Sequence, residues 1–149
     1  MRIEDEIKQK AFKSEFQKAM INILFTSGWL EHKQTQFLKQ WGVSPQQYNV
    51  LRILRGQNNN PITVASIQQR MLDKMSNASR LVEKLKQKNL IERKECKADR
   101  RQVDIIITNK GLNLLSEIDS NMNDHEKFMK ALSKEEAIEL NRILDKLRG

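Results

Sequence analysis

Hydrogen-bonding and cationic side chains gather between Ser76 and Arg101. Hydroxyl, amide, ammonium and guanidinium groups donate or accept hydrogen bonds at the edges of nucleic-acid bases, and the cations among them also bind phosphate. Such a set of groups suits the recognition of a polyanion. The candidate contact residues are Ser76, Asn77, Ser79, Arg80, Lys84, Gln87, Lys97, Arg100 and Arg101.

An amphipathic helix over residues 77–88 is expected to position most of these side chains. Its apolar residues recur at the i, i+3, i+4 and i+7 spacing of a helix, so the polar residues fall on the opposite face. A turn over residues 73–76 separates it from a shorter helix, and the two helices share a small core. The apolar residues are Ala65, Ile67, Met71 and Leu72 in the first helix and Ala78, Leu81, Val82 and Leu85 in the second.

Two strands joined by a charged loop are expected after the second helix. Asn89 suits the left-handed conformation in which many helices end, and residues 90–94 can then leave as a strand. The apolar residues of 103–107 alternate along a returning strand. The loop 95–101 is too charged to bury, and residues 64–111 hold twelve Lys or Arg against six Asp or Glu. This order of elements predicts a winged helix-turn-helix with a basic wing.

The chain resembles the MarR (multiple antibiotic resistance regulator) family in three segments, SRLVEKLKQKNLIER, ADRR and ITNKG. In that family an arginine-led recognition helix precedes an Asp-Arg-Arg wing and a helix that starts at Thr-x-x-Gly. The resemblance covers nearly the whole chain. It departs from the family at Asn89, where Gly is usual, and at Ile107, where Leu is usual. It implies a mostly α fold with a small β-hairpin wing (α+β), in which helices from both ends of each chain interlock in a two-fold dimer.

The flanking segments are expected to form the dimerisation helices. Residues 4–40 contain no proline and one glycine, Gly28, and their loose apolar stripe predicts a long helix that exceeds what one small core can cover. Gly28 could bend or split this helix, since glycine in a helix interior costs about 1 kcal/mol relative to alanine. The expected organisation is a single MarR-like domain over 1–149, with a helical dimerisation region at 1–43 and 108–149 and a winged helix-turn-helix lobe at 44–107.

Capping motifs predict where the other helices start. Ser44 is followed by Pro45 and Gln47, which combines an N-cap serine, a proline at the first helical position and a glutamine at the third. The polar, glycine- and proline-containing stretch 56–61 should end that helix. The remaining expected N-caps are Thr63, Thr108 and Ser133, the last in a capping box with Glu136.

Length and composition set wider bounds. A chain of 149 residues suits one domain, and a net charge of +8 favours a polyanionic partner, although many basic proteins simply carry solvated lysines. The single cysteine, Cys96, excludes an intrachain disulfide. The charged N-terminus lacks an apolar signal core, and no apolar run approaches about 18 residues, so a cytoplasmic protein without a membrane partner is expected.

Several of the selected side chains also have ordinary interpretations. Arg100 and Arg101 could be solvated hairpin residues, but their place in the wing beside Asp99 favours insertion into a minor groove. Arg80 could be a surface charge, but it lies opposite the apolar stripe of its helix and so points where DNA would sit. We therefore expect all three arginines to contact double-stranded DNA.

The remaining reactive side chains do not make a recognisable chemical site. Cys96 lies between basic residues that could lower its pKa slightly, which is too little to assign a redox sensor. His32 and His125 lack the Cys, Asp or Glu spacing of a metal site. The chain has no Gly-rich phosphate loop, nucleophile elbow or HExxH motif. We therefore expect no enzyme activity, no cofactor and no metal.

The expected function is a homodimeric transcriptional regulator, a repressor that binds a pseudo-palindromic operator. Two alternatives remain open: a winged-helix protein-interaction module, since fold does not fix function, and a non-specific architectural DNA binder. The resemblance also implies a small aromatic effector bound between the dimer helices and the DNA-binding lobe. The candidate effector residues are Phe25, Trp29, His32 and Tyr48, each of which could instead be ordinary core.

Overall fold

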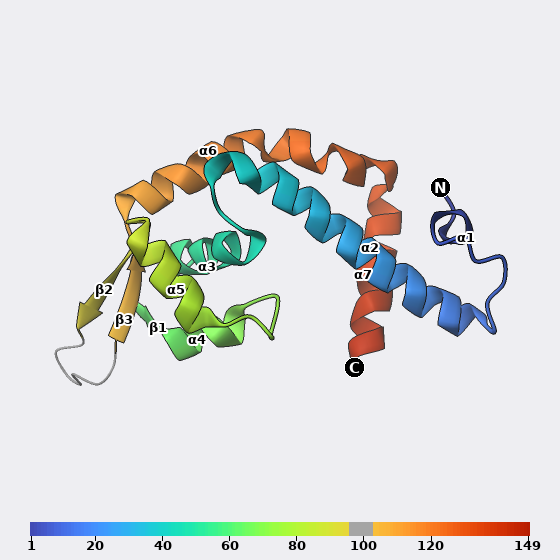
Figure 1. Ribbon diagram of the computed structural model, residues 1–149, viewed down its shortest axis with the longest axis horizontal. Coiled ribbons are helices and arrows are strands. Elements are labelled where there is room, and N and C mark those ends of the chain that lie inside the picture. Colours follow the sequence, from blue (N-terminus) through green and yellow to red (C-terminus); the bar gives the residue numbers. More distant parts are fainter. Residues whose placement is uncertain (96–102) are drawn as a thin grey trace.

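The computed structural model describes residues 1–95 and 103–149. Helices dominate it, and one small antiparallel sheet lies at one end (Figure 1). This confirms the predicted fold class. The elements are α1 (Ile3–Glu6), α2 (Glu15–Leu38), η1 (Lys39–Trp41), α3 (Pro45–Arg55), β1 (Ile62–Thr63), α4 (Val64–Arg70), α5 (Ala78–Gln87), β2 (Ile91–Glu95), β3 (Val103–Ile107), α6 (Asn109–His125), η2 (Glu126–Ala131) and α7 (Lys134–Arg148).

The predicted capping motifs are present and begin the helices where expected. The Ser44 hydroxyl accepts from the backbone N–H of Gln47 at 3.1 Å, and the Gln47 side chain accepts in return from the Ser44 N–H at 3.3 Å. Thr63, Thr108 and Ser133 accept in the same way at the starts of α4, α6 and α7. These bonds satisfy N–H groups that a helix start leaves without a partner.

The expected long helix over residues 4–40 was wrong in its first third. A four-residue α1 ends before Lys8, whose φ of +54° is incompatible with a continuing helix. A new helix starts at Glu15, because the Ser14 hydroxyl caps it by accepting from Gln17 N–H at 3.2 Å. Gly28 does not split α2, which runs unbroken to Leu38.

The winged helix-turn-helix forms one lobe, built from α3, α4, α5 and the sheet (Figure 1). Its sheet has the order β1-β3-β2, so a third strand lies beside the predicted hairpin. That strand is two residues long, with Ile62 opposite Ile105 and Thr63 opposite Asp104. The fully buried side chains that join these elements include Val50, Leu51, Ile67, Val82, Leu85 and Ile105.

Two of the predicted core residues were placed wrongly. Ala65 is exposed, and Leu72 exposes 86% of its surface. Helix α4 ends at Arg70 and Met71 is already extended, so Leu72 lies beyond the helix and leaves its apolar stripe. The other apolar residues of the pair are buried or half-buried as predicted.

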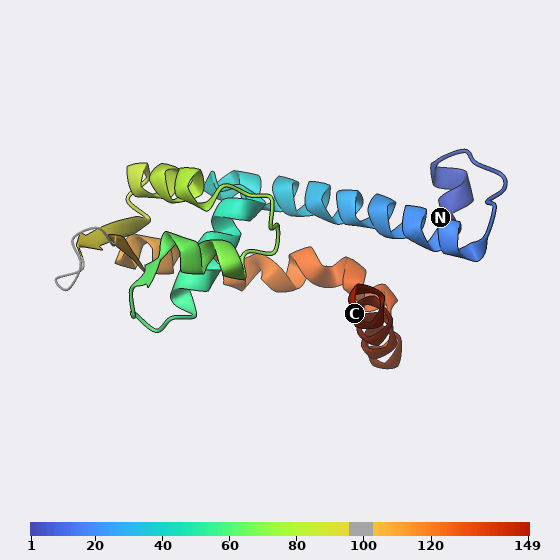
Figure 2. The ribbon, with the colours of Figure 1, turned by 90° about the horizontal axis from the view of Figure 1, so that it is seen from below.

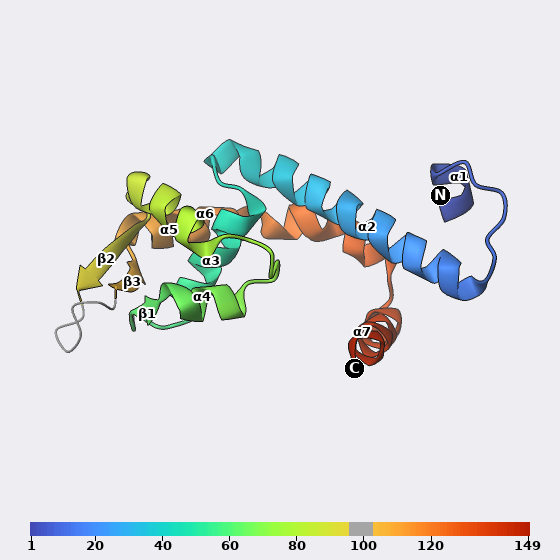
Figure 3. The same ribbon diagram turned by 60° about the horizontal axis from the view of Figure 1, so that its bottom comes forward.

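A helical arm, formed by α1, α2, α7 and the part of α6 that lies beyond the lobe, carries both ends of the chain. Figure 2 shows α2 running away from the lobe to α1, with α6 and α7 on a separate path below it. Figure 3 shows that α7 turns away from α2 instead of packing along it. Helix α7 buries none of its residues against the described part of the chain.

Candidate nucleic-acid interface

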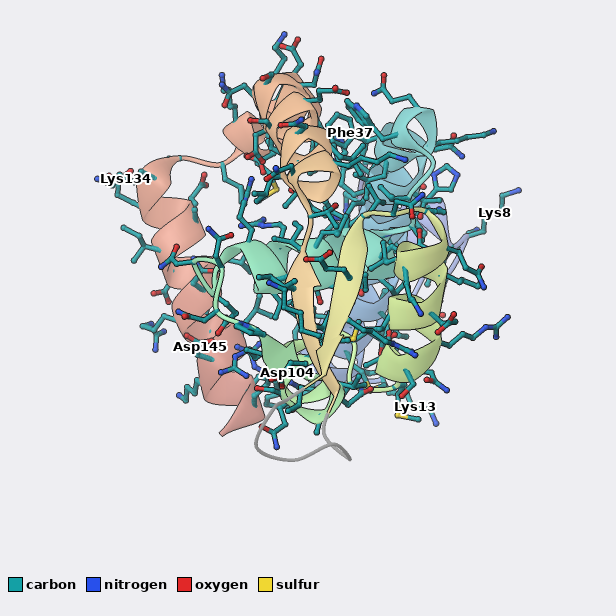
Figure 4. The ribbon with its side chains drawn as sticks, turned by 90° about the vertical axis from the view of Figure 1, so that its left-hand side faces the viewer. Lys8, Lys13, Phe37, Asp104, Lys134 and Asp145 are labelled. Carbon is teal, nitrogen blue, oxygen red and sulfur yellow. The ribbon has the colours of Figure 1, made fainter. Side chains whose placement is uncertain are left out.

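Helix α5 turns one face into the lobe and the other to solvent. Ala78, Val82 and Leu85 are buried at 2% exposure or less, and they contact the core formed with α3 and α4. Figure 4 looks onto this end of the molecule and shows α5 standing beside the β2–β3 hairpin, on which Asp104 is labelled. The predicted contact residues on the solvent side are Asn77, Ser79, Arg80, Lys84 and Gln87, which are exposed, and Ser76, which is half-buried.

The turn before α5 is fixed by side-chain hydrogen bonds. Asp73 accepts from Met75 N–H at 2.9 Å and from the Ser76 hydroxyl at 2.8 Å, and these bonds lower the pKa of its carboxyl, the Ser76 hydroxyl having the larger effect. Asn77 caps α5 by accepting from Arg80 N–H at 3.0 Å. Ser76 and Asn77 therefore also have structural roles, which the sequence pattern did not separate from DNA contact.

An ion pair leaves the outer face of α5 positively charged. Glu83 is the acidic residue of this face, and Arg93 of β2 donates to it at 2.9 Å. Arg80 and Lys84 have no carboxylate within ion-pair distance among the residues that the structure describes. Arg80 and Lys84 are both exposed on this face, while Glu83 is paired with Arg93.

Lys88 points away from this face and ties α5 to the rest of the molecule. Its ammonium donates to the carbonyl oxygen of Gly42 and, at 3.1 Å, to Oε1 of Gln47, which is only 6% exposed. Lys110 donates in turn to the carbonyl oxygen of Lys88 at 3.0 Å. Sequence reasoning missed this role, because Lys88 looks like one more lysine of a basic helix.

The wing is described only at its base. Strands β2 and β3 pair antiparallel from Ile91 opposite Ile107 to Glu95 opposite Val103. The predicted contacts Lys97, Arg100 and Arg101, together with Cys96, lie outside the described residues.

Comparison with known proteins decides the family. Residues 41–102 match the model of the MarR family. The "HTH-type transcriptional regulator MgrA" of Staphylococcus aureus is 30% identical over 109 residues, which are 73% of this chain and 72% of MgrA. The chain belongs to the MarR family. It is a transcriptional regulator with a DNA-binding winged helix, as the sequence predicted.

Solved structures share the fold of this MarR-family chain. A DNA complex of S. aureus MepR has a TM-score of 0.75 at 23% identity and covers 92% of this chain and 97% of MepR. The organohalide-sensing regulator RdhR, in its 2,4-dichlorophenol-bound form, has a TM-score of 0.82 at 20% identity, with 94% of this chain and 85% of RdhR covered. At these identities the likeness concerns the fold alone.

A cavity of about 1050 Å³ lies where the arm meets the lobe of this MarR-family chain. Residues of α2, α3, the 71–73 turn, α6 and η2 line it. Tyr48 is 3% exposed, and its hydroxyl has no hydrogen-bond partner among the described residues. Burial raises the pKa of this phenol, against the effect of the Arg52 guanidinium, which lies 5.8 Å from the ring.

Of the four predicted effector residues, the structure brings only Tyr48 to this cavity. Trp29 packs edge-on against Phe128 with ring centroids 5.1 Å apart, and Phe25 is 37% exposed on α2. His32 lines a smaller hollow with Lys33, Gln36, Phe37 and His125.

His125 was missed by sequence reasoning, which treated it as an isolated histidine. It lines both hollows, and its ring stacks on Phe37 at 4.1 Å with an interplanar angle of 12°. Burial lowers its pKa, while Glu126 raises it and Lys33 lowers it. No local sequence pattern indicates this contact, because Phe37 lies on α2 and His125 ends α6, and only the fold brings them together.

Two further observations concern partners. None of the helices in residues 1–95 and 103–149 has the length and apolar character needed to cross a membrane. Over the same residues, no three His, Cys, Asp or Glu side chains come close enough to hold a metal ion.

Proposed function

We propose that this MarR-family regulator acts as a homodimeric repressor that binds a pseudo-palindromic operator and is released by a small aromatic effector. Each subunit would place α5 in a major groove, so that two α5 helices read half-sites related by the two-fold axis. Lys97, Arg100 and Arg101 of the wing would contact the adjacent minor groove and phosphates.

The outer face of α5 carries this proposal. Its exposed groups are amides, hydroxyls and cations, with the lone carboxylate of the face paired to Arg93. A surface that docks onto protein usually presents apolar or aromatic anchors surrounded by polar groups. The composition of this face therefore favours base edges and phosphates over the interaction-module alternative.

Exposed apolar side chains on the arm support the dimer. Phe16 and Leu24 of α2 expose 88% and 66% of their surface, and Ile138 and Leu147 of α7 expose 59% and 67%. Met20, 57% exposed, lies between Phe16 and Leu24 at the four-residue spacing of one helix face. An exposed apolar patch along a helix marks an interaction site. A second copy of the chain is the natural occupant, because a two-fold dimer also supplies the second α5 that a palindromic site requires.

The cavity at the junction of arm and lobe supports release by an effector. Its walls combine apolar side chains, among them Ile53, Met122 and Phe128, with polar ones, among them Tyr48, Arg52 and His125. Small-molecule sites likewise pair apolar surface with a few polar groups that orient the ligand. A ligand at this junction would be placed to change the angle between α2 and the lobe. Such a ligand releases DNA only if it binds the DNA-free form more tightly than the DNA-bound form. For a tenfold loss of operator affinity, the two binding free energies must differ by roughly 1.4 kcal/mol.

Selection of bound genomic fragments at near-physiological salt tests the proposal. We expect enrichment of a short inverted repeat bound by a dimer, as measured by sedimentation of the complex. Carboxylates placed on the exposed apolar surface of the arm, as in Leu24→Glu with Ile143→Glu, should give monomers with weak operator binding. Equal binding to all fragments would indicate an architectural DNA binder, and no binding to any of them would overturn the proposed function.

Effector release has its own test. Aromatic carboxylates and phenols are titrated into the protein with and without operator. The proposal expects some to bind more weakly by an equal factor when operator is present, because linkage is reciprocal. Equal binding in both states, or binding unaffected by Tyr48→Phe and Arg52→Ala together, would contradict release through this cavity.

A further inference from the structure

Met75 exposes its apolar side chain almost completely, at 92%, immediately before the recognition helix α5. Only the half-buried Ser76 and the N-cap Asn77 separate it from the first helical residue. Met71, at the other end of the same turn, is buried at 1%. The two methionines of this turn therefore have opposite environments, and only one of them contributes to the core.

The direction of Met75 is set by the fold. Its backbone N–H donates to Asp73, and the carbonyl of the preceding residue, Lys74, accepts from Gln68 Nε2 at 3.2 Å. The Oε1 atom of Gln68 accepts from Ala78 N–H at 3.0 Å. One glutamine of α4 thus bonds both sides of the turn, so Met75 is held outward by bonds on each side of it.

The surroundings of Met75 identify what an apolar group would meet there. Leu72, the other apolar residue that this turn exposes, lines the cavity at the junction of arm and lobe, and Met75 does not. The exposed residues close to Met75 in sequence include the polar or cationic Lys74, Asn77, Ser79 and Arg80. A protein partner would need an apolar patch around an anchor. In helix-turn-helix proteins the N-terminal residues of the recognition helix contact base edges, and the apolar group that a major groove offers is the 5-methyl group of thymine.

We propose that Met75 is a specificity-determining residue that reads thymine methyl groups at one edge of each operator half-site. The inference rests on the proposed DNA-binding function of α5. Methionine suits this role, because its unbranched, polarisable thioether adapts to the irregular floor of the groove. Polar residues of α5 would read the hydrogen-bonding edges of bases, while Met75 would supply the apolar contact.

Replacement of thymine by deoxyuridine tests this directly, because it removes only the methyl group. Each thymine of the selected operator is replaced in turn, and affinities are measured by fluorescence anisotropy for the wild type, Met75→Ala and Met75→Leu. Burial of one methyl-sized group is worth about 0.8 kcal/mol, so the wild type should lose about fourfold in affinity at one thymine per half-site. Deoxyuridine in the flanking DNA serves as the control.

The expected pattern is specific to a direct contact. Met75→Ala should bind thymine and deoxyuridine operators equally, Met75→Leu should keep most of the discrimination, and the wild type and Met75→Ala should bind the substituted operator alike. A folding defect would not produce that last equality. A wild type insensitive to every substitution, or a sensitivity that persists in Met75→Ala, would overturn the proposal. Failure of the wild type to bind any operator would instead overturn the proposed function.

Discussion

Lys88, the residue that ends the recognition helix, donates its ammonium to Oε1 of Gln47 at 3.1 Å and to the carbonyl oxygen of Gly42. Gly42 caps η1, the short helix that follows α2, with a φ of +65°, and Gln47 lies in the first turn of α3. One side chain therefore links α5, the proposed recognition helix, to the joint between arm and lobe. A change in the angle of the arm would act on α5 through this link.

Removal of this ammonium should weaken both fold and DNA binding. Lys88→Met keeps the alkyl stem but leaves the buried Gln47 oxygen short of a donor, which should lower the free energy of unfolding by about 1–2 kcal/mol. Operator affinity should fall with unchanged sequence preference, because no base contact is lost. Urea unfolding and anisotropy titration measure the two effects, with exposed Lys86→Met as the matched control. Equal behaviour of the two variants would show that the link has no energetic role.

Asn89 should respond in opposite ways to two small substitutions. Its φ of +59° lies in the left-handed region, where glycine is unstrained and a Cβ costs about 1 kcal/mol. Asn89→Gly should therefore leave stability unchanged or slightly raised, whereas Asn89→Ala should lower it by about 1 kcal/mol. Thermal unfolding distinguishes the variants. An alanine variant more stable than the glycine variant would contradict a backbone strain at position 89.

The sequence predicted those parts of the fold that depend on neighbouring residues. The Ser44 capping box and the left-handed Asn89 are local patterns of hydrogen bonding and backbone geometry, so a short stretch of sequence specifies each. The two residues of β1 become a strand only because β3 lies beside them. The Lys88 link spans 41 residues of sequence to Gln47, and no local pattern indicates it.

The same distinction holds for the candidate site. The outer face of α5 follows from helical periodicity, which is why its exposed residues were predictable. The cavity depends on how α2, α3 and η2 meet, so periodicity could not indicate that Tyr48 and His125 line it and that Phe25, Trp29 and His32 do not.

Gly111 should tolerate no side chain. A Cβ there would overlap the carbonyl oxygen of Leu90 and lie 2.7 Å from Ile107 Cγ1, and the backbone oxygen cannot move without disturbing β2. Gly111→Ala should lower the free energy of unfolding by about 1–3 kcal/mol or more. Gly56→Ala is the control, since its Cβ would meet only ordinary contacts at 3.5 Å and should change stability by less than about 1 kcal/mol. Similar stability of the two variants in urea would contradict the close packing of Gly111 against Leu90 and Ile107.

Acid should release α1 from α2. Lys18 donates to Glu4 at 2.6 Å, and this bond, helped by a backbone N–H and Arg2, lowers the pKa of Glu4 from its ordinary 4.5 to about 2. Because the folded pKa is depressed, the pairing stabilises α1 fully above about pH 4.5, and the stabilisation is lost as the pH falls towards 2. Amide hydrogen exchange of residues 3–7 should therefore lose protection over that range. Lys18→Met should strongly reduce this pH dependence, because Lys18 makes the largest contribution to the lowered pKa of Glu4 and joins α1 to α2. An undiminished pH dependence in that variant would show that the Lys18–Glu4 pair is not its cause.

The central claim is that the outer face of α5 reads base sequence, and Arg80 tests it most directly. Anisotropy titrations compare the wild type, Arg80→Ala and Lys10→Ala, a charge-matched control on the segment between α1 and α2, against the selected operator and its single-base-pair variants. We expect Arg80→Ala to lose about 1–3 kcal/mol of discrimination at specific base pairs while Lys10→Ala keeps the wild-type preference. An unchanged preference in Arg80→Ala, or an equal loss at every base pair, would contradict base reading by this face.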